Sequence, residues 1–204
     1  MSFDNSLDDK LTFYASCFST NFKFLNTIQI MKQYFMSTEC LDIVYTKNNQ
    51  VDFIHKLLGE NGTKVECKNF YTEIDLSIKN NKIDENTDCC IIFFDLENNE
   101  SLIELNKILN FISVNSDINW KIYVINIYTN EKNIKSNLTE ENINVYFEKY
   151  SLTNYDISIV NLDTSDEIVK VIDSITEDTL QDKHLFKGNR NLDNDKSKSV
   201  CQII

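Results

Sequence analysis

The run Cys89-Cys90-Ile91-Ile92-Phe93-Phe94-Asp95 is the most informative segment of this 204-residue chain. Six apolar residues follow one another in it, with no polar residue between them. A strand with one solvent-exposed face would alternate apolar and polar side chains, so an unbroken run indicates a strand that is covered on both faces. We therefore expect this segment in the middle of a parallel sheet of an α/β protein.

The hydrophobic spacing before and after this run alternates between short apolar segments and longer segments of helical period. After Asn21, which can cap a helix, Phe24, Ile28, Met31 and Phe35 recur at steps of three and four and so share one helix face. We predict six strands, at residues 11–16, 41–46, 64–70, 89–95, 120–127 and 156–162. We predict helices after Asn21, at 100–114, at 139–150 and from Thr164, and a short helix at 52–58. Residues 71–88 are expected to form a loop.

The start of the last predicted helix has a capping box. Thr164 supplies a hydroxyl at the cap, and Glu167 supplies a carboxylate three residues later. The order of all these elements predicts one α/β domain over residues 1–180, with a mostly parallel six-stranded sheet and helices on both faces. Residues 181–204 have few apolar side chains and are expected to form a flexible tail.

Glycine and histidine are too scarce for several kinds of chemistry. The chain has three glycines, Gly59, Gly62 and Gly188, and no proline. Loops that cradle phosphates need glycine where backbone amides turn tightly towards an anion, so a working P-loop, Rossmann fingerprint or kinase glycine-rich loop is excluded. Only two histidines, His55 and His184, are present, which argues against zinc enzymes and histidine acid–base catalysis. We therefore predict no cofactor and no catalytic metal.

Charge and cysteine usage limit the partners and the compartment. The formal net charge of −12 disfavours binding to DNA or RNA, which requires a basic face. None of the cysteines forms a C-x-x-C pair, so we interpret them as small buried hydrophobes in a reducing compartment. No signal peptide and no apolar run of about 18 residues is present, which predicts a cytosolic protein. The six cysteines are Cys17, Cys40, Cys67, Cys89, Cys90 and Cys201.

The element order and several sequence landmarks resemble the Ras superfamily of small GTPases. Residues 88–102 resemble the strand in which that family runs through aliphatic residues to an aspartate, followed by a helix that begins with serine. Residues 121–126 resemble the strand that carries the NKxD guanine motif, and residues 138–141 and 155–162 resemble the next helix and the last strand. The resemblance covers residues 10–204 and implies a small-G-protein fold; a related subgroup is the Rab-like, adaptin-binding group of clathrin accessory factors.

The matching positions lack the residues with which this family binds phosphate and magnesium. The P-loop pattern falls on residues 15–22, where Ala15 and Thr20 replace its two glycines. Asn21 replaces its lysine, and Phe22 replaces its magnesium-binding hydroxyl. The charge of a triphosphate would therefore be unmatched at this place.

The other motifs of the family are degraded as well. The glycine of DxxG has no counterpart, because residues 63–187 contain no glycine. Asn126 keeps the asparagine of NKxD, but Ile127 and Thr129 replace its lysine and aspartate, and residues 161–163 read Asn-Leu-Asp where the family has its SAK-like stretch. The resemblance thus implies a pseudo-GTPase with no catalytic residues and with Thr20, Asn21 and Asn126 as vestigial positions. We expect aromatic side chains to fill the place of the nucleotide, namely Phe13, Tyr14, Phe18, Phe22 and Phe24.

The last four residues, Cys201-Gln202-Ile203-Ile204, fit the C-a-a-X signal for prenylation of Cys201, and the family it resembles has the same signal at the same place. One prenyl chain binds a membrane weakly and reversibly. Residues 181–204 carry five basic and three acidic residues, a net of +2, and so are not repelled by an anionic leaflet. We expect a cytoplasmic protein that associates reversibly with the cytosolic leaflet; the type of prenyl group stays open.

These observations together predict a membrane-tethered interaction or adaptor module in vesicle trafficking or signalling, without nucleotide and without enzymatic activity. The family binds partners through its switch loops, which implies protein contacts at about residues 45–61 and 70–88 here. Two alternatives stay open. One is a divergent GTPase that hydrolyses GTP slowly with Asn126 and unconventional phosphate contacts, and the other is a purely cytosolic interaction domain.

Overall fold

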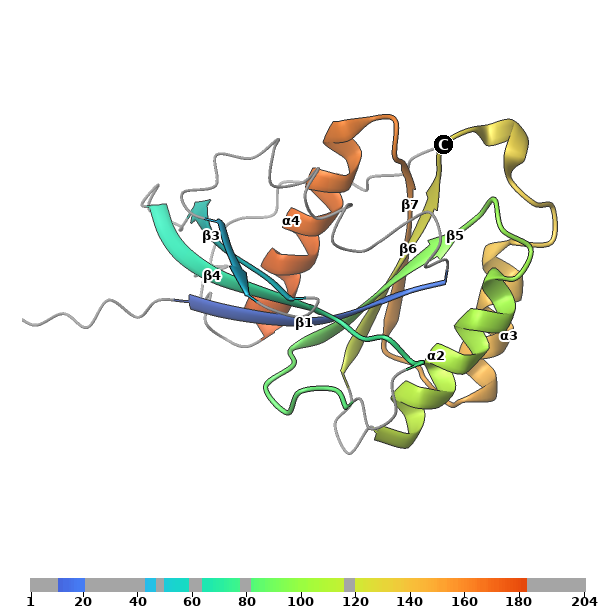
Figure 1. The fold of residues 1–204 in the computed structure, drawn as a ribbon, viewed down its shortest axis with the longest axis horizontal. Coiled ribbons are helices and arrows are strands. Elements are labelled where there is room, and N and C mark those ends of the chain that lie inside the picture. Colours follow the sequence, from blue (N-terminus) through green and yellow to red (C-terminus); the bar gives the residue numbers. More distant parts are fainter. Residues whose placement is uncertain are drawn as a thin grey trace, which may run out of the picture.

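A computed structural model describes residues 11–20, 43–46, 50–58, 64–77, 82–115 and 120–182. Over these residues the chain forms one seven-stranded sheet in the order β2-β3-β4-β1-β5-β6-β7, together with three α-helices (Figure 1). The strands are β1 (Leu11–Ser19), β2 (Ile43–Thr46), β3 (Gln50–Leu58), β4 (Lys64–Glu73), β5 (Cys89–Asp95), β6 (Lys121–Tyr128) and β7 (Tyr155–Asn161). The helices are α2 (Ser101–Asn115), α3 (Glu140–Lys149) and α4 (Ser165–Asp182), and η1 (Glu131–Asn133) is a short 3-10 turn.

The five strands β4-β1-β5-β6-β7 are all parallel, and in chain order among themselves they run 2-1-3-4-5. β5 has β1 on one side and β6 on the other, and all seven of its residues are buried. The prediction of an α/β protein with Cys89–Asp95 as a central parallel strand is therefore confirmed. The predicted strand number was wrong, because the sheet has seven strands and not six.

The additional strand is β3, in the segment where the sequence favoured a short helix at residues 52–58. β3 instead pairs antiparallel with β4 over nine positions, from Gln50 opposite Thr72 to Leu58 opposite Lys64, and β2 pairs antiparallel with β3. A helix of one or two turns is marginal by itself. A hairpin with β4 supplies a full ladder of hydrogen bonds, which explains why the strand forms. The helix predicted after Asn21 lies outside the described residues.

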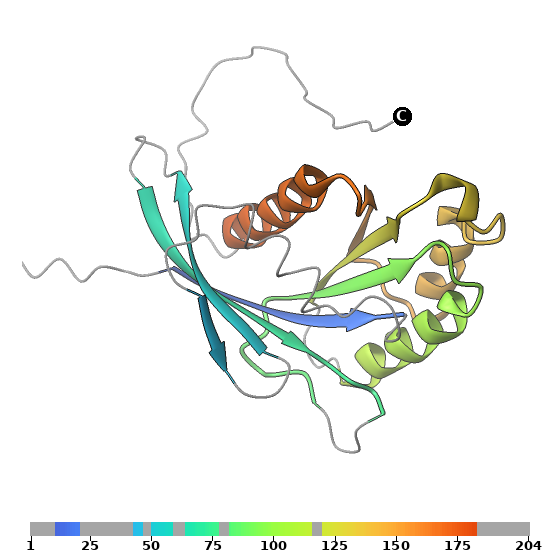
Figure 2. The ribbon, with the colours of Figure 1, turned by 45° about the horizontal axis from the view of Figure 1, so that its top comes forward.

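Two hydrophobic cores lie on opposite faces of the sheet. α4 covers one face, and α2 and α3 cover the other (Figure 2). Side chains of β5 alternate between them: Ile91 and Phe93 belong to the α4 core, and Ile92 and Phe94 belong to the α2–α3 core. This alternation is the period of two that a strand imposes. The prediction of helices on both faces is confirmed.

The expected aromatic filling of a nucleotide site was wrong for the described residues. Phe13 is fully buried in the α4 core, and Phe18 is fully buried against Phe111 in the α2–α3 core, with ring centroids 6.1 Å apart. Tyr14 stacks on Phe70 of β4 at 4.7 Å. These rings pack on the two faces of β1 because strand residues alternate. Phe22 and Phe24 lie outside the described residues.

Four of the cysteines, Cys17, Cys67, Cys89 and Cys90, are buried and form no disulfide. Burial raises the pKa of the Cys90 thiol to about 12 and raises the pKa of Cys17 well above its ordinary value. A neutral buried thiol is a poor nucleophile and metal ligand. The interpretation of these four cysteines as small core residues is confirmed, whereas Cys40 and Cys201 lie outside the described residues.

No helix in the described ranges is both long enough and apolar enough to cross a bilayer.

Candidate functional site

The topology of the sheet places the candidate site at the carboxyl ends of β1 and β5. The chain passes from β1 to β4 on one side of β1, and its later strands continue from β5 on the other side. In open α/β sheets, ligands bind outside the carboxyl ends of the strands at such a switch point. The residues at this edge are Ser19 at the end of β1 and Thr20 directly after it, residues 95–101 from the end of β5 to the start of α2, and residues 126–130 at the end of β6.

A chain of hydroxyl groups joins the ends of β1 and β5. The Thr20 hydroxyl oxygen accepts a hydrogen bond from the Asp95 amide at 3.0 Å, and the same hydroxyl donates to Ser101 Oγ at 3.2 Å. Ser101 Oγ in turn donates to the Asp95 carbonyl at 2.6 Å. The Thr20 amide donates to the Phe93 carbonyl at 3.0 Å. These four bonds join the carboxyl ends of β1 and β5 to the start of α2, and we call the hydrogen-bonded set of Thr20, Asp95 and Ser101 the closed edge.

The electrostatics of this edge disfavour an anion. Its side chains include the carboxylates of Asp95, Glu97 and Glu100, and neither residues 95–101 nor residues 126–130 contain a lysine, an arginine or a histidine. A bound phosphate would need basic side chains or a glycine-rich nest of amides. The described part of this edge offers neither. Within the described ranges, no group of three or more His, Cys, Asp or Glu side chains is placed to hold a metal ion.

Glu97 ties the loop after β5 to the loop after β6. Its carboxylate accepts from the Thr129 amide at 2.8 Å, from the Thr129 hydroxyl at 2.9 Å and from the Asn130 amide at 2.7 Å. Partial burial alone would raise the pKa of Glu97, but the hydrogen bonds from Asn130 and Thr129 outweigh it and hold this pKa below its ordinary value. Thr129, which stands where the guanine-reading aspartate was expected, is therefore engaged by Glu97.

We expect Glu97→Gln to weaken this loop connection by about 1 kcal/mol, since a charged acceptor binds amides more strongly than a neutral one and the site is exposed. Hydrogen exchange at the Thr129 and Asn130 amides should become about fivefold faster. The stabilisation by Glu97 is complete above the ordinary carboxyl pKa and is lost as the pH falls through the depressed value. Glu100→Gln, an exposed change in the same loop, serves as the control. Equal exchange in both variants would contradict the role of Glu97.

Asn126 lies in β6, paired with Phe94 of β5 and Ile159 of β7. The side chain is 2% exposed, and its Oδ1 atom has no hydrogen-bond partner among the described residues. An unsatisfied buried acceptor costs about 1–3 kcal/mol. Its neighbour Ile127, at the lysine position of NKxD, is fully buried in the α4 core.

Of the three predicted vestigial positions, the structure describes Thr20 and Asn126. Thr20 directly follows β1 and Asn126 lies on β6, so the two residues flank β5 from opposite sides. Asn21 and Cys201 lie outside the described residues. The proposed match of residues 15–22 to a P-loop was wrong in position, because β1 extends to Ser19 and the first five of these residues are strand. The absence of phosphate-binding glycine is unaffected, since no glycine precedes Gly59.

The hydrogen bonds at the start of α4 differ from those of the predicted capping box. Glu167 Oε2 accepts from the Asn161 amide at 2.9 Å, and the Thr164 carbonyl accepts from the Glu167 amide at 3.1 Å. The carboxylate of Glu167 thus reaches back to the end of β7. The pattern correctly located the helix start, but it assigned the carboxylate to the wrong amide.

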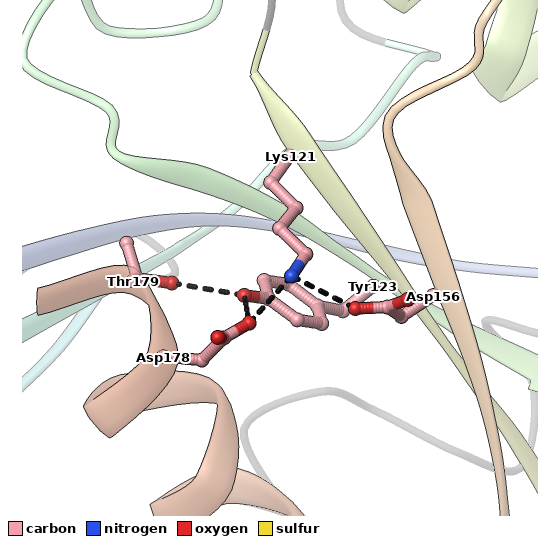
Figure 3. Close-up of polar contacts among 5 residues, drawn as sticks. All are labelled: Lys121, Tyr123, Asp156, Asp178 and Thr179. Atoms are coloured by element: carbon pink, nitrogen blue, oxygen red, sulfur yellow. Dashed lines mark hydrogen bonds and ion pairs between the residues drawn. The ribbon is translucent and has the colours of Figure 1, made fainter. Parts of the chain in front are cut away.

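A polar cluster at the amino ends of β6 and β7, opposite to the carboxyl ends described above, was not predicted from the sequence (Figure 3). Lys121 Nζ lies 2.5 Å from Asp178 Oδ2 and 2.9 Å from Asp156 Oδ2. The Tyr123 hydroxyl donates to Asp178 at 2.7 Å and lies 3.3 Å from Thr179 Oγ1. The cluster joins the start of β6 and β7 to the end of α4. The sequence signal that could have indicated this cluster is the pair of opposite charges, Lys121 and Asp156, at the starts of two neighbouring strands.

The ionisation of this cluster follows from its contacts. Burial opposes charge on Lys121, but hydrogen bonds to Asp178 and Asp156 raise the pKa of Lys121 above its ordinary value. Burial favours the neutral form of Asp178, but the hydrogen bonds from Lys121 and Tyr123 lower the pKa of Asp178. Burial raises the pKa of Tyr123, and Asp178 adds to this effect. The cluster holds α4 against the sheet as an ion pair with a neutral phenol beside it.

No protein-family model matches the chain, and a search of curated proteins finds no significant match. The fold and the edge define the class as an α/β protein with a parallel 2-1-3-4-5 core and a self-bonded switch point.

Proposed function

We propose that the chain is a nucleotide-free small-G-protein-like module that binds other proteins and is attached to membranes by a prenyl group on Cys201. The observation that carries the first part is the closed edge at Thr20, Asp95 and Ser101. The order of the parallel strands, with antiparallel β3 beside β4, is compatible with the resemblance to small GTPases. At the site where such a fold would hold GTP, the described residues contribute hydroxyl-to-backbone bonds and carboxylates, which supports the proposal that no phosphate is bound there.

The expected partner surface, at about residues 45–61 and 70–88, is supported by the pairing of the strands. β3 runs beside β4, and Gln50 of β3 is paired with Thr72 of β4. The two segments, which belong to consecutive strands of the chain, therefore meet at one end of the sheet. This proximity suits a protein contact that uses both segments at once, as an adaptor in trafficking or signalling would.

The absence of GTP binding is tested by thermal unfolding of the full chain. A ligand at about a hundredfold excess over its Kd adds about 2.7 kcal/mol of stability, which for this size is roughly 5–10 °C in Tm. We expect no shift with millimolar GTP and magnesium, and none with ATP as the matched control. A magnesium-dependent rise with GTP alone would contradict the proposal. It would favour the slow GTPase, for which the unpaired Oδ1 of Asn126 is the supporting observation.

The lipid is tested by the intact mass of the chain from a eukaryotic host and by fractionation of cells. We expect the mass to include one prenyl group on Cys201, and Cys201→Ser to move most of the protein from the membrane fraction to the soluble fraction. Ser199→Ala, a change two residues away that keeps the thiol, is the control. An unmodified mass and unchanged fractionation would favour the purely cytosolic interaction domain.

A further inference from the structure

β7 is the last strand in the order of the sheet, and its far side has no other described strand beside it. It pairs with β6 without interruption from Tyr155 opposite Ile122 to Asn161 opposite Tyr128. An edge strand of this kind presents backbone N–H and C=O groups to its surroundings.

The hydrogen bonds at the two ends of β7 show which residues face this edge. The Ile122 amide donates to the Asn154 carbonyl, and the Leu162 amide donates to the Tyr128 carbonyl. In a parallel pair, alternate residues bond to the same neighbour, so the even-numbered residues of β7 bond to β6. The backbone groups of Tyr155, Ile157 and Ile159 therefore point away from the sheet.

The carboxyl end of this edge is closed, whereas no described residue bonds to the outward backbone groups in the middle of the strand. Asn161 has both outward groups engaged, because Glu167 accepts from its amide and the Thr164 amide donates to its carbonyl. Natural edge strands are usually protected by lysine, proline or a bulge. β7 has no proline and no bulge in its pairing, and Ile159 is 49% exposed. This edge has the features of a strand that pairs with a further strand.

The two sides of the edge differ in character. Tyr155 and Ile157 pack against the α2–α3 core, and Ile159 shares their side of the strand by alternation. On the α4 side lies Asp156, whose side chain is 58% exposed and shares Lys121 with the 42% exposed Asp178. Two carboxylates for one lysine leave a negative charge on this side. The complementary strand has apolar side chains on one face and basic side chains on the other.

Charge and topology select the occupant. A second copy of the chain would bring another protein of net charge −12 to an edge that is itself negatively charged at Asp156 and Asp178. A strand formed by the chain after α4 would need a left-handed crossover, because α2 and α3 carry the outward steps from β5 to β6 and from β6 to β7 on the opposite face from α4. Crossovers in parallel sheets are right-handed in about 98% of cases.

We propose that the edge of β7 binds an extended segment of another protein in which lysine or arginine alternates with apolar residues. The segment adds an eighth strand to the seven-stranded sheet, with its apolar side chains beside Ile159 and its basic side chains beside Asp156. Main-chain hydrogen bonds to Ile157 and Ile159 supply affinity, and the alternation supplies specificity. This surface lies at the opposite end of the sheet from β2, and it does not depend on the proposed function.

The test uses the full chain and a peptide in which lysine and valine alternate. The peptide has about eight residues, which is within the usual length of a strand. We expect binding in fluorescence anisotropy, and slower hydrogen exchange at the amides of Ile157 and Ile159 on binding. A peptide of the same composition with all lysines before all valines controls for simple charge attraction, and a glutamate–valine peptide controls for charge sign. Neither is expected to protect these amides.

Ile159→Lys should weaken binding by about tenfold, because it places a like charge on the edge and removes the apolar contact. Val145→Lys, at a 60% exposed position on α3, is the matched control and should bind as the parent does. Asp156→Asn should reduce the preference for the lysine peptide over the glutamate peptide. Three results would each overturn the proposal: equal binding of the block peptide, amides of Ile157 and Ile159 that are already protected in the free monomer, or protection that grows only with protein concentration through self-association.

Discussion

Phe93→Ala is expected to lower the free energy of unfolding by about 3–5 kcal/mol. Phe93 is fully buried in the α4 core, on the central strand β5. Removing the ring deletes its transfer free energy and leaves a cavity that a β-strand paired on both sides cannot close. A domain of ordinary stability, about 5–15 kcal/mol, would lose a large part of it.

The measurement is urea unfolding, followed by circular dichroism, with the parent and variant compared at equal slope. Phe94→Ala removes the same ring from the α2–α3 core and should cost a similar amount, since Phe94 is equally buried. Val114→Ala, at a 76% exposed position on α2, should change stability by no more than about 0.5 kcal/mol. A loss below about 1 kcal/mol for Phe93→Ala would mean that β5 is not the packed centre of the sheet.

Thr20→Val is expected to destabilise the protein by about 1–3 kcal/mol, although the two side chains have nearly the same shape. The Thr20 hydroxyl accepts from the Asp95 amide and donates to Ser101, and all three residues are at least nine-tenths buried. Valine leaves the buried Asp95 amide without this acceptor, so the cost is the desolvation of that amide.

Thr20→Ser keeps the hydroxyl and provides the matched control for Thr20→Val. The two variants are compared by urea unfolding, together with hydrogen exchange at the Asp95 amide, which should become faster only in the valine variant. A valine variant as stable as the parent, with unchanged exchange, would show that the hydroxyl chain does not hold β1 and β5 together. The physical support for a closed, ligand-free edge would then be lost.

The central strand and the helices around it were predictable because their signals are local. An unbroken apolar run is sufficient to place Cys89–Asp95 inside the sheet, and periods of three and four residues indicate α2 and α3. β3 was not predictable in this way. Its residues 52–58 mix four apolar with three polar side chains, which suits either a helix turn or a strand, and the choice depends on β4, which follows it in the chain.

The candidate edge was predictable in its chemistry and not in its geometry. The lack of glycine before Gly59 already shows that this part of the chain has no glycine-rich phosphate loop, and the loss of lysine and aspartate beside Asn126 removes the residues that the resembled family uses to read guanine. The bond between Thr20 and Ser101 joins residues 81 positions apart, and no local pattern marks either of them as a partner. The alignment of the P-loop pattern with residues 15–22 was wrong in position for a related reason, because β1 continues to Ser19 through pairing with β5.

Composition and periodicity were sufficient to establish an α/β chain with a buried middle strand, since each residue contributes these properties wherever it lies. That the chain binds no nucleotide stays a prediction. The contacts between distant segments established the rest: the order of the strands, the hydroxyl chain at Thr20, the Lys121 cluster beneath α4 and the exposed edge of β7. These features depend on which segments meet, and the free energy of a pairing is shared between both partners, so neither segment alone reveals it.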